Sequence, residues 1–187
     1  MDDHKLDLPN ANAYIISRYA ENTAQTFEYL ENHLEWLHDE RVPDRPYCHM
    51  GIDYIVSTGQ FRKEHSFDAK VLEIMREINT RFNVIMNSCY AMFYKNGNAE
   101  LPYRSNVESQ VDLEQPLFSI GYGAPRYITF KDIHSGKEHD FLLVDGDLLI
   151  MSDNCQRNYI YSVKKSTEYT EPRITLAFRH FLDGTSL

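Results

Sequence analysis

Two arginines near the end of the sequence are the first candidates for chemistry. They open and close the β-type run Arg173–Arg179, in which alternate side chains point to opposite faces. Arg173 and Arg179 therefore share one face with Thr175, and the other face is apolar, with Ile174, Leu176 and Phe178. Because a guanidinium fork matches a carboxylate, the polar face predicts either a pocket for a dicarboxylate or a pair of internal salt bridges.

Cysteine and histidine are too scattered to indicate a disulfide framework or a metal centre. The three cysteines, Cys48, Cys89 and Cys155, are odd in number and not closely spaced, which predicts a reducing, intracellular compartment. His134 and His139 are a close pair in a predicted surface turn, and their spacing favours an adventitious site over a catalytic one.

Composition narrows the class of protein. With 187 residues, 42% of them hydrophobic, the chain can form one domain with a sizeable core. No stretch approaches the ~20 apolar residues that span a bilayer, and the acidic, polar start predicts no secretory signal. The net charge of −9 disfavours a general binder of nucleic-acid phosphates.

The elements that must position the arginines begin with two helices. The first is expected from a capping box at Asn22 to about Asp39, and the second from an N-cap at Ser66 to Phe82. The buried stripe of the second helix is Val71, Ile74, Met75, Ile78 and Phe82. Between the two helices, residues 45–59 resemble a hairpin.

After Phe82 the sequence changes to short β-type runs about ten residues apart, separated by Gly, Pro, Asp and Asn. These runs are 84–86, 89–94, 117–122, 127–131, 141–144, 148–151, 159–163 and 173–181. Helices followed by at least six strands predict an α+β fold with an antiparallel double sheet of the jelly-roll kind. We expect a single domain, 1–187, with N-terminal helices and a lid hairpin in 1–82 and the jelly-roll core in 83–182.

Several segments, in order, resemble the AlkB family of iron(II)- and 2-oxoglutarate-dependent nucleic-acid dioxygenases. They are Arg45-Pro46-Tyr47 to Ser57-Thr58-Gly59, Asn87-Ser88-Cys89 with Tyr94-Lys95-Asn96-Gly97, Ser119 to Arg126, Gly146 to Met151 with Gln156, and Pro172 to Arg179. The resemblance implies a double-stranded β-helix core, of cupin type, with the N-terminal helices packed on one sheet. It also implies a substrate lid containing Tyr47, Tyr54 and Ser57, and a cosubstrate pocket containing Tyr94, Arg173 and Arg179.

The same resemblance places different residues at all three metal-ligand positions. Arg104 and Asn106 stand where the family has His and Asp, and Tyr161 stands where it has the second His. Arginine has no lone pair to give a cation, Asn is a weak neutral donor, and Tyr ligates only when ionised. We therefore expect no metal and no iron cofactor, although 2-oxoglutarate or another small anion can still be the ligand.

Three functions follow from these replacements. The first is a pseudo-dioxygenase that binds a small anion, a nucleotide or a protein partner, with duplex DNA disfavoured by the acidic charge and no role for a membrane. The second is a metal-independent hydrolase or lyase that uses Glu108, Tyr161 and Arg104 on a nucleotide or modified base. The third is an active oxygenase with an unusual metal site. We expect a cytoplasmic protein, and a phage or viral source would suit such a small, diverged member.

Overall fold

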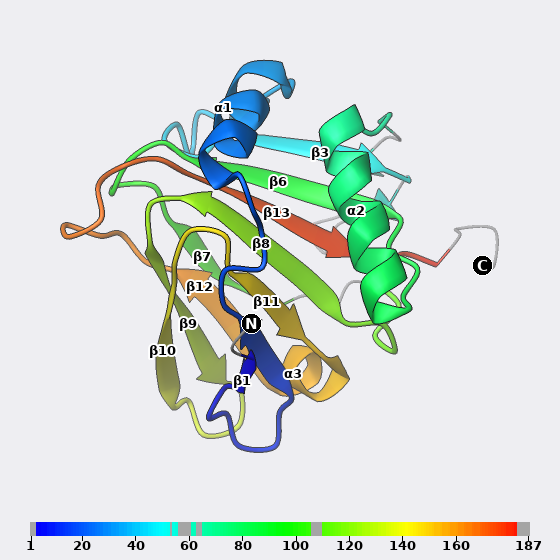
Figure 1. Cartoon of the computed structure of the whole chain (residues 1–187). Helices are drawn as coiled ribbons and strands as arrows, with labels where there is room; N and C mark the ends of the chain where they lie inside the picture. The colour runs from blue at the N-terminus through cyan, green and yellow to red at the C-terminus, as the bar shows by residue number, and fades with distance from the viewer. Residues whose placement is uncertain (1–2, 53, 56–60, 63–64, 106–109, 183–187) are drawn as a thin grey trace.

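The core consists of two antiparallel sheets that face each other (Figure 1). The structure, a computed structural model, describes residues 3–52, 54–55, 61–62, 65–105 and 110–182. The larger sheet has the order β1 (Asp3–Lys5), β2 (Ala13–Ile16), β11 (Leu148–Met151), β8 (Leu117–Gly123), β13 (Arg173–Arg179), β6 (Ser88–Tyr94) and β3 (Tyr47–Gly51). The smaller sheet has the order β10 (Glu138–Leu143), β9 (Arg126–Asp132), β12 (Tyr159–Val163) and β7 (Leu101–Arg104). This arrangement is the predicted double-stranded β-helix.

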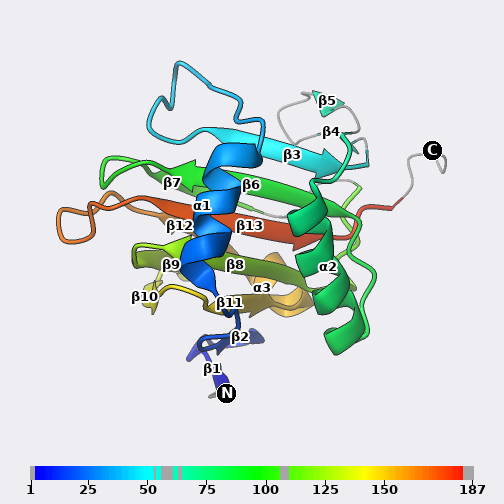
Figure 2. The same cartoon turned by 45° about the horizontal axis from the view of Figure 1, so that its top comes forward.

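Two helices cover the outer face of the larger sheet, α1 (Thr23–His33) and α2 (Ala69–Phe82), as Figure 2 shows. A short helix, α3 (Asp153–Asn158), joins β11 to β12. The predicted stripe of α2 is confirmed, since Val71, Ile74, Met75 and Ile78 are its buried residues. In the part of the chain that the structure describes, no helix is long and apolar enough to cross a membrane.

The predicted N-cap of α2 is wrong, and that of α1 is right in position but does not make the predicted capping bond. Asp68, and not Ser66, caps α2, because its carboxylate accepts hydrogen bonds from the backbone of Lys70 and Val71. Asn22 precedes α1 in a left-handed conformation, with φ of 50°, and its side chain makes no capping bond.

The first helix is also shorter than predicted. It ends at His33, because Leu37 and Tyr47 exchange backbone hydrogen bonds of 2.8 and 3.0 Å and draw the chain after the helix into the sheet edge. The predicted 45–59 hairpin is replaced by β3, which pairs with β6, and by a separate pair of two-residue strands, β4 (Tyr54–Ile55) and β5 (Phe61–Arg62).

The alternation predicted for the last strand is confirmed. Its apolar face, with Ile174, Leu176 and Phe178, belongs to the core cluster between the larger sheet and the helices. The opposite face, with Arg173 and Thr175, lines the space between the two sheets. The fold therefore directs the polar residues of β13 to the place where the resemblance puts the functional site.

Candidate functional site

The pairing of β7 with β12 brings together two of the expected metal-ligand positions. Arg104 lies opposite Tyr161 in the register of the smaller sheet, and Tyr161 is buried between the sheets. The guanidinium carbon of Arg104 lies 6.0 Å from the ring centre of Tyr90 on β6. The other two predicted residues of this region, Asn106 and Glu108, lie outside the described residues.

These residues do not fit iron(II). A guanidinium brings a fixed positive charge and no lone pair, and a phenol ligates a metal only after it loses its proton. Within the described ranges, no three His, Cys, Asp or Glu side chains gather as a possible metal site, and this includes the surroundings of His134 and His139.

Arg173 is buried, and its side chain is hydrogen-bonded to the backbone. Its side chain is 3% exposed, and its Nη1 donates a hydrogen bond of 2.8 Å to the carbonyl oxygen of Ala124. Burial lowers the pKa of this guanidinium to about 10. The guanidinium lies directly over Gly121, where a β-carbon would come within 1.9 Å of its Nη2. The strand β8 thus leaves room for this arginine by having a glycine at that position.

Tyr94 lies beside Arg173, as the resemblance implies, because the two residues are opposite each other in β6 and β13. Its hydroxyl is 3.6 Å from the sulfur of Met92, two residues earlier on β6. Burial raises the pKa of Tyr94 well above the ordinary value, and the nearby charges of Arg45, Arg173 and Arg104 oppose that rise.

Arg179 closes the same strand. It is buried and lies opposite Ser88, six residues from Arg173. At about 3.3 Å per residue, the two backbones are ~20 Å apart, so one small anion can contact both arginines only if their side chains extend toward each other.

The space between the sheets is small in this conformation. Its cavity has a volume of about 30 Å³, and its walls are largely apolar. Its lining residues include Met92, Leu117, Leu149, Met151 and Tyr161. A typical small-molecule pocket has a volume of roughly 300–1,000 Å³. Any ligand larger than one or two waters must therefore displace side chains here or bind at the mouth.

Two stacked tyrosines lie at the edge of this space, because Tyr47 pairs with the lining residue Met92 and Tyr90 packs against the core between the sheets; we call this place, with Arg104, the mouth. The rings of Tyr47 and Tyr90 have centres 5.6 Å apart and planes 19° apart, next to Arg104. Tyr47 was predicted as a lid residue and is placed here on β3. Tyr54 is the first residue of β4, and Ser57 lies outside the described residues.

Arg126 and Asp147 have structural roles. The Arg126 guanidinium donates to four backbone carbonyls, those of Pro125, Tyr169, Asn96 and Glu171. The Asp147 carboxylate accepts from two backbone amides, those of Arg18 at 3.1 Å and Val144 at 2.9 Å. Both side chains therefore hold segments of the backbone together.

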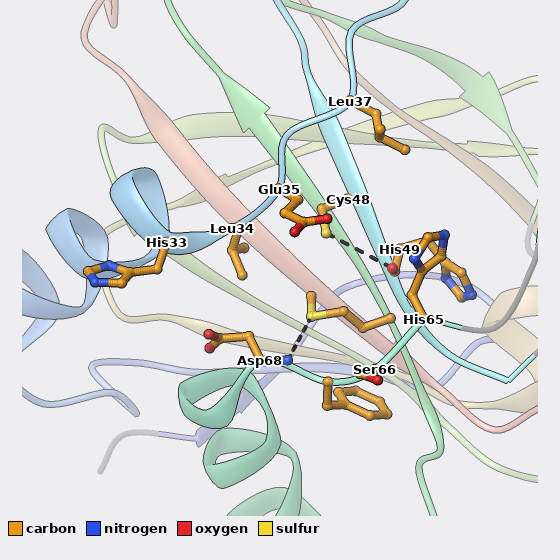
Figure 3. A pocket seen from close by; sticks show the side chains of 11 residues that line it. His33, Leu34, Glu35, Leu37, Cys48, His49, His65, Ser66 and Asp68 are labelled. Atoms are coloured by element: carbon orange, nitrogen blue, oxygen red, sulfur yellow. Dashed lines mark hydrogen bonds between the residues drawn. The ribbon is translucent and has the colours of Figure 1, made fainter.

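A second cavity, of about 400 Å³, lies at the sheet edge between the end of α1, β3 and the start of α2 (Figure 3). Glu35, Cys48 and Asp68 are among its lining residues. Burial and the two carboxylates raise the pKa of Cys48 to about 11, so the thiol is protonated and unreactive near neutral pH. The Asp68 carboxylate is occupied by the cap of α2 and by the hydroxyl of Tyr29 at 3.0 Å.

Comparison with known proteins agrees with the fold described above. A curated relative, the uncharacterized protein R406 of Acanthamoeba polyphaga mimivirus, is 22% identical over 145 residues, which are 75% of each chain. The solved structure of OsALKBH1 superposes with a TM-score of 0.67 at 11% identity, covering 90% of this chain and 97% of that one. A prolyl-4-hydroxylase of Pseudomonas putida superposes with a TM-score of 0.57 at 13% identity, covering 95% and 96%. The model of the 2OG-Fe(II) oxygenase superfamily matches residues 11–179, so the chain belongs to this superfamily, with an AlkB-like fold.

Proposed function

We propose that this protein acts by binding a small anion or a nucleotide at the mouth between its sheets, without iron chemistry. The observation that carries the proposal is the pairing of Arg104 with Tyr161, at two positions where the resemblance expects histidine ligands. The protein is then an AlkB-like pseudo-dioxygenase.

The charge of Arg104 works against a metal at this place. A unit charge and a divalent ion 4 Å apart repel each other by about 8 kcal/mol at an effective dielectric constant of 20. The same charge favours an anion. Arg104 lies opposite Tyr161, which lines the space between the sheets, and Arg179 is on the same strand as Arg173, which lines it as well.

The stacked pair Tyr47 and Tyr90 supports a flat ligand beside that charge. An aromatic face next to a guanidinium suits a nucleobase attached to a phosphate, because the ring can stack while the phosphate meets the arginine. A nucleotide combines both features, whereas a simple dicarboxylate uses only the arginines.

The decisive experiment compares the natural chain with a variant that restores the family's ligands, Arg104→His/Asn106→Asp/Tyr161→His. Each protein is titrated anaerobically with iron(II) in the presence of 2-oxoglutarate, and the visible charge-transfer band and bound iron are measured. We expect no stoichiometric iron in the natural chain and a one-to-one complex in the variant. A one-to-one complex in the natural chain would refute the proposal and favour an active oxygenase.

Ligand binding is tested separately by thermal shift with nucleoside monophosphates, 2-oxoglutarate and inorganic phosphate. We expect the largest rise in melting temperature with a nucleotide, and its loss in Arg104→Gln. The matched control is Arg157→Gln, because Arg157 is an exposed cation on α3 that lies 3.3 Å from Glu114 and does not line the space between the sheets. Turnover of a nucleotide, with release of base or phosphate, would instead favour the metal-independent enzyme. If no ligand shifts the melting temperature, a protein partner becomes the better hypothesis.

A further inference from the structure

Arg45 is a buried arginine without an acceptor. Its side chain is only 9% exposed, and its Nε is buried with no hydrogen-bond partner. Over the described residues, none of its guanidinium nitrogens makes a hydrogen bond or an ion pair, in contrast to Arg126, which reaches four carbonyls. A buried guanidinium Nε without an acceptor is costly, which points to an acceptor that comes from outside the chain.

The backbone holds Arg45 in a defined place. The carbonyls of Asp44 and Pro46 accept hydrogen bonds from Lys95 at 3.0 Å and Phe93 at 2.9 Å, which continues the ladder of β3 and β6. Arg45 therefore lies opposite Tyr94, close enough for its charge to oppose the rise that burial causes in the pKa of that phenol. Arg45 lies two residues before β3, and its backbone is held in place because both flanking residues are bonded to β6 or to the residue after it.

Arg45 also lines a cavity of about 260 Å³ that opens at this end of the sheet. The polar residues of its lining are Arg41, Asp44, Arg45, Asn98, Glu100 and Lys165. None of these residues lines the space between the sheets, so this cavity is distinct from the site described above.

The surrounding charges select the kind of anion. Arg41 is already bound to Asp39 at 2.6 Å, and Lys165 lies 4.0 Å from Glu100. The Asp44 carboxylate accepts a hydrogen bond of 3.0 Å from Asn96 and makes no ion pair with Arg45. Arg45 is thus the one cation of this lining that makes no ion pair within 4.0 Å among the described residues, and the carboxylate that its charge reaches, Asp39, is already bound by Arg41. The two carboxylates on the rim, Asp44 and Glu100, repel a doubly charged group.

The geometry points to a binding site for the carboxylate of a small organic acid, in which the Arg45 guanidinium receives the carboxylate. A carboxylate carries a single charge and matches the guanidinium fork in two parallel hydrogen bonds. This inference does not depend on the proposed function of the mouth between the sheets, because the two places share no residue.

The test is an NMR titration of the arginine Nε–H signals of the natural chain, with the Arg45 signal assigned from its loss in Arg45→Lys. Sodium acetate is added against sodium chloride at equal ionic strength, and inorganic phosphate forms a third arm. We expect a saturable shift of the Arg45 signal with acetate, a smaller one with phosphate and none with chloride. The exposed Arg157 is the internal control. An Arg45 signal that does not move with acetate, or moves only as much as that of Arg157, overturns the inference.

A stability measurement separates binding from a purely structural role. In chloride alone, Arg45→Met is expected to keep or raise the melting temperature, because it removes a buried charge that has no partner, and it should abolish stabilisation by acetate. The control Arg126→Met should lower the melting temperature in both buffers, since it leaves four carbonyls without their donor. If Arg45→Met melts well below the natural chain in chloride, Arg45 is structural and the inference fails.

Discussion

The contact between Gly121 and Arg173 leads to a quantitative prediction. In Gly121→Ala the new β-carbon would lie 1.9 Å from Nη2, 2.4 Å from Cζ and 2.9 Å from Nε of Arg173. The backbone of Gly121 has no positive φ, so alanine causes no backbone strain there, and the three atoms nearest to its β-carbon all belong to Arg173. The clash falls on a side chain and not on a backbone, and we expect the guanidinium to be displaced while the sheet stays intact.

The expected cost follows from what Arg173 loses. Displacement breaks the charge-assisted hydrogen bond to Ala124, worth about 1.5–3 kcal/mol, in a buried place. Overpacking of the surrounding core adds about 1–3 kcal/mol. Alanine itself is better than glycine in a strand by roughly 0.5–1 kcal/mol. We therefore expect Gly121→Ala to lower the free energy of unfolding by about 2–5 kcal/mol.

A double-mutant cycle with Arg173→Ala isolates the contact. Urea unfolding of the natural chain, both single variants and the double variant should show that Gly121→Ala costs little once Arg173 is truncated, with a coupling of at least about 1.5 kcal/mol. Gly136→Ala is the control, because a β-carbon there meets nothing within 4 Å and only the backbone strain at φ of 72° is tested. Free energies that add within about 0.5 kcal/mol would refute the placement of Arg173 over Gly121.

Two further predictions concern buried groups. Arg126→Gln should lower the free energy of unfolding by about 3–5 kcal/mol, measured by urea unfolding, because a shorter neutral side chain leaves several buried carbonyls without donors. Burial raises the pKa of Cys48 to about 11 and that of Cys155 to about 12, and raises that of Cys89 as well. A thiol reagent at pH 8 should therefore label all three cysteines only after unfolding, and rapid labelling of the native chain would contradict their burial. Since these pKa values are raised in the folded state, their contribution to stability is complete below about pH 9 and decreases as the pH rises toward 11.

The sequence was most informative where a side chain's surroundings follow from period-two alternation or helical spacing. Arg173 and Thr175 face the space between the sheets and Ile174 faces the helices, because a central strand buried on both sides must separate its polar from its apolar residues. The same holds for the stripe of α2, where Val71 and Ile78 pack against the sheet at helical spacing.

The failures occurred where tertiary pairing overrides local preference. Ala13–Ile16 and Leu101–Arg104 are four-residue strands whose identity depends on partners far along the chain, β11 and β12 respectively. Asparagine is a residue type that often caps helices, but Asn22 has a left-handed backbone conformation and its side chain makes no capping hydrogen bond. The sequence did not predict Arg45 as a site residue. Its period-two alternation with Tyr47 nevertheless indicates that the two side chains share one face of the extended segment.

The placement of arginine bears on which anions can reach this protein. Among the described residues, the buried charged side chains are the four arginines Arg45, Arg126, Arg173 and Arg179 and a single acid, Asp147. The chain as a whole carries −9, so the surface is more negative than the net charge indicates, while the interior is positive. A long polyanion such as duplex DNA would have to lie along that negative surface, and each of its phosphates would meet repulsion. A single carboxylate or one nucleotide meets less of this repulsion, because it contacts only the surroundings of one guanidinium. A binder with this charge distribution should therefore weaken in affinity as its ligand is lengthened from a mononucleotide to an oligonucleotide, and tighter binding of the longer ligand would show that the surface charge does not control access.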